Sequence, residues 1–88
     1  MKRSKLEIIQ DILKIIQQNH NEIKPTPLLR KSNLSSSRFQ EYFQDLLKKE
    51  FIIEKETKAG KIISLTEKGF RYLEKYKSII GFIEEFDL

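Results

Sequence analysis

The feature that most restricts the fold of this chain is a change in hydrophobic periodicity near residue 51. Before that point apolar residues recur every three or four positions, whereas residues 51–56 and 61–65 are short runs rich in β-branched side chains. The first spacing is typical of amphipathic helices and the second of strands. The four residues between the runs, 57–60, end in glycine, which favours a β-hairpin. We therefore expect an α+β domain, mostly α, with one hairpin near its middle.

Four helices are expected around this hairpin. The sequence predicts them over residues 5–19, 27–32, 36–49 and 67 to about 86. The first begins with a capping box made by Ser4 and Glu7 and carries Leu6 on its apolar stripe. Thr26 suits the N-cap of the second helix and Pro27 its first position, which needs no amide donor.

The third expected helix has two contrasting sides. Its apolar side contains Phe39, Phe43 and Leu46 at helical spacing, which predicts a core stripe. The opposite side carries hydroxyl, amide and carboxylate groups, at Ser37, Gln40, Glu41 and Gln44. A short helix, a tight turn and a longer helix with a small, polar first turn together predict a helix-turn-helix.

The composition argues for binding and against catalysis. Cysteine is absent and His20 is the only histidine, so the usual nucleophile–base pairs and zinc sites are not available. No apolar run approaches the roughly 20 residues that span a bilayer, and no apolar signal core follows the basic start. We expect an intracellular protein that is not an enzyme, needs no metal or cofactor and has no membrane partner.

Net charge is concentrated in the first half of the chain. Residues 1–49 carry ten Lys and Arg against five Asp and Glu, whereas residues 50–88 carry seven against eight. A basic half indicates a polyanionic partner, most commonly nucleic acid. The alternative is that the excess simply reflects a composition dominated by Lys, Ile and Glu.

Several runs of the sequence are similar to one known family. They are Leu6-Glu7-Ile8-Ile9, Asp11-Ile12-Leu13, Pro25-Thr26, Asn33-Leu34-Ser35 and Leu65-Thr66-Glu67-Lys68-Gly69. Together they resemble the winged helix-turn-helix domains of small archaeal transcriptional regulators and dimeric chromatin proteins. The resemblance implies that the third helix enters the DNA major groove and that the hairpin, or wing, contacts the backbone or minor groove. It also implies a cytoplasmic, nucleoid-associated protein with a winged helix-turn-helix domain over residues 1–66.

One position departs from that family. Many relatives end the third helix with a Lys-Gly-Leu turn, in which glycine supplies a positive φ angle. Here the matching residues are Lys49, Glu50 and Phe51. We therefore expect this exit to be built differently or to be strained.

The candidate DNA-binding residues come from four parts of the chain. They are Arg3, Lys5, Thr26, Arg30, Lys31, Ser36, Ser37, Arg38, Gln40, Glu41, Gln44, Lys58 and Lys61. Hydroxyls and amides bond base edges or phosphates, and cations bond phosphates. Glu41 repels phosphates, but it is also able to accept a hydrogen bond from a cytosine amine. The alternative is an ordinary solvated surface, or a winged helix that docks other proteins.

The last expected helix, residues 67–88 with its tail, has the seam of a coiled coil. The residues expected at a homodimer interface are Leu73, Tyr76, Ile79, Ile80, Ile83 and Phe86. A helix of about 20 residues is roughly 30 Å long, so its distal half is expected to protrude from so small a domain. The alternative is a tail that packs on its own domain. Gly81 fits either a close crossing of two helices or a bend.

Overall fold

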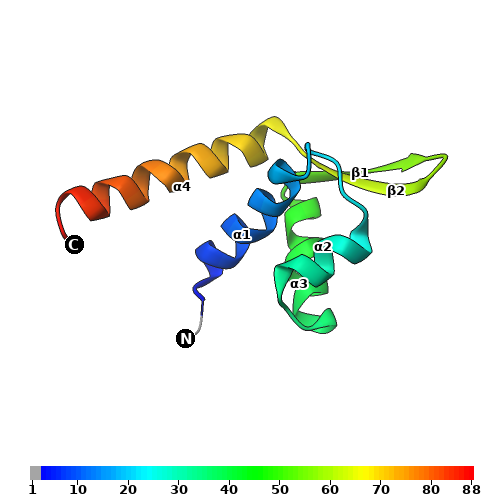
Figure 1. Cartoon of the computed structure of the whole chain (residues 1–88), viewed down its shortest axis with the longest axis horizontal. Coiled ribbons are helices and arrows are strands. Elements are labelled where there is room, and N and C mark those ends of the chain that lie inside the picture. Colours follow the sequence, from blue (N-terminus) through cyan, green and yellow to red (C-terminus); the bar gives the residue numbers. More distant parts are fainter. Residues whose placement is uncertain (1–2) are drawn as a thin grey trace.

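The computed structural model describes residues 3–88 and contains a mostly helical fold with one hairpin (Figure 1). In chain order its elements are α1 (Lys5–Gln18), α2 (Pro25–Ser32), α3 (Ser36–Lys48), β1 (Ile52–Thr57), β2 (Gly60–Leu65) and α4 (Glu67–Glu85). The expected order of elements is confirmed, and most of their ends agree within one residue. The capping box at Ser4 is also present, since the Glu7 amide donates to the Ser4 hydroxyl at 3.2 Å.

The hydrophobic core is built around α1, which contacts α2, α4 and β2. Every third or fourth residue of α1 is buried, and Ile12, Leu13 and Ile16 have no exposed surface. From the other elements the core receives Leu28, Phe39, Phe43, Leu46, Ile52, Ile63 and Leu65. The expected place of Leu6 on this stripe is wrong. Its side chain is 57% exposed because it lies at the first turn, beyond the edge of the core.

The second helix begins earlier than expected. Lys24, not Thr26, is its N-cap, and Pro25 is its first residue. A residue before proline favours extended backbone, and Lys24 has φ −78° and ψ 153°. Pro25 and Pro27 both lie in the first turn, where the amides have no partner within the helix, so neither proline removes a helical hydrogen bond.

The wing is a tighter hairpin than the sequence indicated. Thr57 and Gly60 face each other in the register, so only Lys58 and Ala59 form the turn, not four residues. The Thr57 hydroxyl closes the turn by accepting from the Ala59 amide at 3.2 Å and donating to the Gly60 carbonyl at 2.8 Å. At the base of the wing, Ile23 forms a β-bridge with Ile63 and extends the sheet.

The exit of α3 is strained in the way its sequence suggested. The Glu50 amide donates to the Leu47 carbonyl at 3.1 Å, and the Phe51 amide donates to the Leu46 carbonyl at 2.9 Å. This pair of bonds is the Schellman motif, whose central residue adopts a left-handed conformation. Glu50 occupies that position with φ 62°.

The beginning of α4 is fastened to this exit. The Thr66 hydroxyl donates to the Glu50 carbonyl at 2.6 Å, and the Thr66 amide donates to the Phe51 carbonyl at 3.1 Å. The Lys68 ammonium donates to the Lys49 carbonyl at 2.8 Å. These three carbonyls lie just beyond the last residue of α3, so the bonds give them partners and fix the exit of α3 relative to α4.

The far half of α4 projects away from the rest of the domain (Figure 1). The molecule measures 49 × 27 × 21 Å, and its long axis follows this helix. Ile79, Phe82 and Phe86 are more than half exposed, and Ile83 is 36% exposed. The expected protrusion is confirmed, and the described tail does not fold back on its own domain. The helix continues through Gly81 without a break.

Candidate nucleic-acid interface

The exposed side of α3 is the main candidate for a binding surface. Ser35 caps this helix by accepting from the Arg38 amide at 3.3 Å. Phe39, Phe43 and Leu46 are buried and hold α3 against the core. The opposite side is entirely solvent-exposed, and it contains Ser36, Ser37, Gln40, Glu41, Gln44 and Lys48. The sequence correctly predicted which side of α3 faces the core and which side is free.

A shallow hollow beside α3 brings together two candidates that are distant in the sequence. Lys5 and Arg38 line it together with Glu41, Tyr42 and Asp45, and its volume is about 380 Å³. Both cations are exposed. Two cations and two carboxylates therefore meet at one edge of the polar side of α3.

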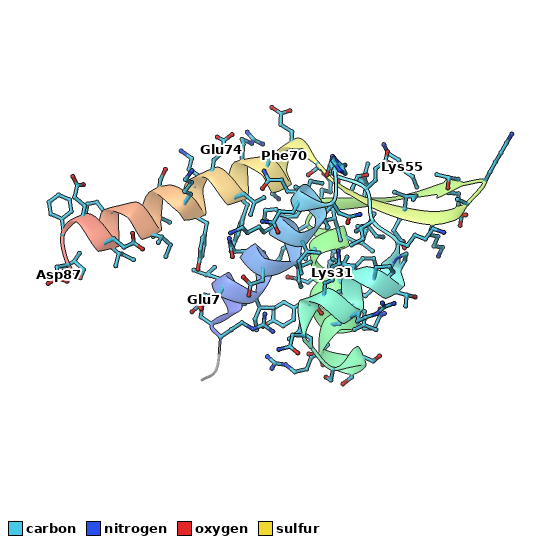
Figure 2. The ribbon with its side chains drawn as sticks, viewed as in Figure 1. Glu7, Lys31, Lys55, Phe70, Glu74 and Asp87 are labelled. Atoms are coloured by element: carbon cyan, nitrogen blue, oxygen red, sulfur yellow. The ribbon has the colours of Figure 1, made fainter. Side chains whose placement is uncertain are left out.

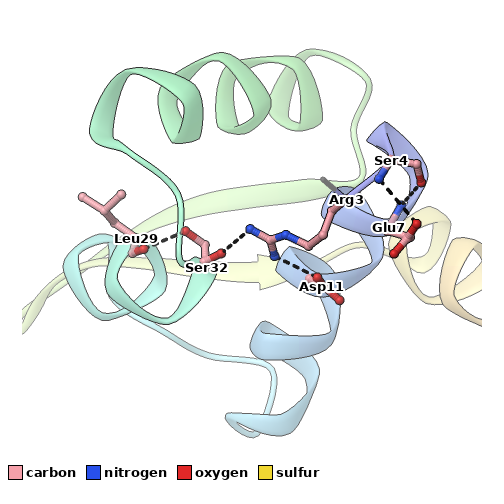
Figure 3. Close-up of polar contacts among 6 residues, drawn as sticks. All are labelled: Arg3, Ser4, Glu7, Asp11, Leu29 and Ser32. Atoms are coloured by element: carbon pink, nitrogen blue, oxygen red, sulfur yellow. Dashed lines mark hydrogen bonds and ion pairs between the residues drawn. The ribbon is translucent and has the colours of Figure 1, made fainter. Parts of the chain in front are cut away.

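Arg3 is engaged inside the protein, as Figure 3 shows. Its guanidinium lies 2.8 Å from the Asp11 carboxylate and donates to the Ser32 carbonyl at 3.0 Å. The Ser32 hydroxyl in turn donates to the Leu29 carbonyl at 2.6 Å. These bonds fasten the start of the chain to α2, so in this arrangement Arg3 stabilises the fold.

A second group of cations lies where α1 meets α2. Thr26, Arg30 and Lys31 are exposed on α2, and Figure 2 shows Lys31 beside α1. Lys31 lines a hollow of about 310 Å³ with Arg3 and Lys14. Lys14 was missing from the residues expected to bind DNA, because only the packing of α1 on α2 brings it near the others.

The wing carries charges of both signs. Lys58 is exposed in the turn, whereas Lys61 is paired in the register with Glu56. Cross-strand neighbours of opposite charge attract each other, so Lys58 is the freer of the two cations. Lys55, between Glu54 and Glu56 in the sequence, is also exposed on the wing (Figure 2) and was not among the expected contacts.

The residues expected at a dimer interface form a continuous apolar side of α4. Leu73, Tyr76 and Ile80 are half-buried, and Ile79, Ile83 and Phe86 are exposed. Tyr72 borders the buried end of this side and donates to the Leu6 carbonyl at 2.9 Å. Burial raises the pKa of Tyr72, and the neighbouring Tyr76 raises it further.

Neither a metal site nor a membrane span is found among the described residues. Between residues 3 and 88 no three His, Cys, Asp or Glu side chains are grouped to hold a metal ion. In the same part of the chain no helix has the length and apolar character to cross a membrane.

Comparison with known proteins gives one family and three similar solved chains, two of which are described below. Residues 2–84 match the winged helix-turn-helix family model. F93 from STIV, described as a winged-helix DNA-binding protein, is 21% identical with a TM-score of 0.75, covering 90% of this chain and 91% of F93. Sso10a-2, a DNA-binding protein from Sulfolobus solfataricus, is 24% identical with a TM-score of 0.75, covering 96% of this chain and 85% of its own. Among curated proteins, no sequence matches closely enough to count as a relative.

Proposed function

We propose that this chain, which belongs to the winged helix-turn-helix family, binds double-stranded DNA with α3 in the major groove. The observation that carries the proposal is the fully exposed polar side of α3, opposite a buried stripe that fixes the helix on the domain. Amides and hydroxyls on such a side bond base edges and phosphates. The two similar structures, both described as DNA-binding, support the same function.

Cations around α3 are suitably placed for the phosphates. Arg38 lies on α3 and Lys5 lines the same hollow beside it, Arg30 and Lys31 lie on α2, and Lys58 lies at the tip of the wing. Contacts to phosphates position a protein on the duplex without reading its sequence. In this proposal the wing therefore contacts the backbone, and Thr26 and Lys61 add to the same polar rim.

We further infer that the protein acts as a homodimer through α4. The exposed apolar residues of its far half need a cover, since large apolar patches on a free monomer favour aggregation. Charge favours an antiparallel pair. Residues 67–77 carry four cations against two carboxylates, whereas residues 84–87 carry three carboxylates and no cation. The dimer would then hold two α3 helices on one duplex. Such a protein would act as a transcriptional regulator or as an architectural protein of the nucleoid.

A triple substitution tests the role of α3. Replacing Ser37, Gln40 and Gln44 with Ala should lower DNA affinity in gel-shift titrations. The melting temperature should barely change, because exposed substitutions usually alter stability by less than about 0.5 kcal/mol. A control removes an amide and a hydroxyl elsewhere, by replacing Gln17 and Ser78 with Ala, and should bind like the parent.

Unchanged affinity of the α3 variant for every duplex would show that this helix does not contact DNA. A second candidate function, docking of another protein, would then be preferred. The carboxylates on the wing, Glu54 and Glu56, are the observation that favours it, because they weaken attraction to phosphates.

A further inference from the structure

Glu41 is the residue of α3 that the proposed function does not explain. It lies in the middle of the exposed side, and at helical spacing its neighbours there are Ser37, Gln44 and Lys48. Those three neighbours are neutral or cationic, whereas Asp45, one turn further along α3, is a carboxylate that is paired with Lys49. A carboxylate between them repels DNA phosphates, so it weakens binding unless it makes a favourable contact of its own.

The carboxylate of Glu41 has no partner within the part of the chain that the structure describes. Asp45, one turn further along α3, is paired with Lys49 at 3.1 Å. Arg38 and Lys5 line the same hollow as Glu41, yet among residues 3–88 the ion pairs are those of Asp45 and Asp11. The two oxygens of Glu41 are therefore free to accept hydrogen bonds from a ligand.

The major groove offers a specific donor for these oxygens. When a helix lies in that groove, base edges face its central ridge, and phosphates lie towards its flanks. Cytosine presents its exocyclic amine there, and a carboxylate accepts from this group. Guanine and thymine present acceptors to the groove, which repel a carboxylate.

We propose that Glu41 determines base specificity by accepting a hydrogen bond from the exocyclic amine of a cytosine. This inference rests on the proposed DNA binding. It adds that each α3 helix recognises the base at one position of the DNA site. Two effects follow from removing the carboxylate. General DNA affinity rises because repulsion is lost, and preference for cytosine falls because the acceptor is lost. A carboxylate that is merely solvated produces only the first effect.

The experiment begins with selection from a random duplex library by the full chain and by Glu41→Ala and Glu41→Gln variants. The parent should enrich sites with cytosine at one fixed position. Glu41→Ala should lose that preference, and Glu41→Gln should shift it towards adenine, because a glutamine amide pairs with the adenine edge. Glu74→Gln removes the same charge from an exposed position on α4 and should leave the selected sites unchanged.

A base analogue then tests the contact itself. In the selected duplex the cytosine is replaced by a pyrimidin-2-one nucleotide, which lacks the exocyclic amine. The parent should lose roughly 5- to 150-fold in affinity, the range expected for one good base contact. The affinity of Glu41→Ala for the duplex should barely change with the replacement.

The outcomes separate this inference from the proposed function. A parent that binds no duplex overturns DNA binding itself. The role of Glu41 is overturned, while DNA binding stands, if the parent and Glu41→Ala show the same base preference. It is also overturned if both proteins lose the same affinity for the duplex that contains the analogue.

Discussion

At the residue scale, the exit of α3 stores strain at Glu50. This residue has φ 62°, a left-handed conformation that costs an L-residue roughly 1–2 kcal/mol. Its backbone cannot leave that conformation without breaking the bonds to Leu47 and Thr66. The sequence indicated this position, because the resembling family has glycine there. Only the structure shows that the same turn forms with Glu50 in the left-handed conformation.

Glu50→Gly should therefore stabilise the protein. Glycine adopts a positive φ freely, although it loses more backbone entropy on folding, by about 0.5–1 kcal/mol. We expect the free energy of unfolding to rise by about 0.5–1 kcal/mol net, measured by urea denaturation. Glu74→Gly, which removes the same carboxylate in the middle of α4, should instead lower it by about 1 kcal/mol. A loss of stability in Glu50→Gly would show that the side chain contributes more than the strain costs.

Two glycines of α4 should respond oppositely to alanine. A Cβ on Gly69 would overlap the Phe51 carbonyl oxygen, whereas a Cβ on Gly81 would meet no atom within 4 Å. Overpacking typically costs about 1–3 kcal/mol, so Gly69→Ala should lower the melting temperature. Gly81→Ala should raise stability by up to about 1 kcal/mol, because alanine favours the helix. A Gly81→Ala variant that dissociates on sedimentation would instead place a close helix crossing at this residue.

At the element scale, local sequence patterns predicted each helix and strand. They did not predict the features that depend on tertiary contacts. The stripe on α1 and the caps at Ser4, Ser35 and Thr66 are local features, and all are present. The exposure of Leu6 depends on where the core ends, which no periodicity shows. The hollow shared by Lys5 and Arg38 likewise arises from packing between distant segments.

The wing should contribute to DNA binding chiefly through salt-dependent contacts. Each phosphate contact adds about 0.9 to the slope of log affinity against log salt concentration. Replacing Lys58 and Lys61 with Ala should flatten this slope without changing sequence preference. Lys58→Ala alone should account for most of the change, because Lys61 faces Glu56 across the strands. Lys75→Ala on α4 serves as the control, and equal slopes for all of these proteins would remove the wing from the interface.

At the scale of the whole molecule, the fold separates a head, which contains α3 and the wing, from an arm formed by the far half of α4. The head ends where Thr66 and Lys68 fasten α4 to the exit of α3. Beyond Leu73 the helix leaves the core, and its apolar side becomes progressively exposed. The sequence predicted this arm from its length and spacing. In the proposed dimer a second molecule covers this arm, so the position of that molecule depends on contacts between two chains.

Charges placed on the exposed arm should separate the proposed dimer without unfolding the head. Ile79 and Ile83 are 56% and 36% exposed, so replacing both with Glu leaves the core intact but puts two carboxylates into an apolar, symmetric interface. In sedimentation equilibrium the parent should have the mass of two subunits and the variant that of one, with similar helical content by circular dichroism. Gln40→Glu with Gln44→Glu, which adds the same two charges to the exposed side of α3, should remain dimeric. A parent that is monomeric at micromolar concentration would falsify the dimer, and each head would then have to bind DNA alone.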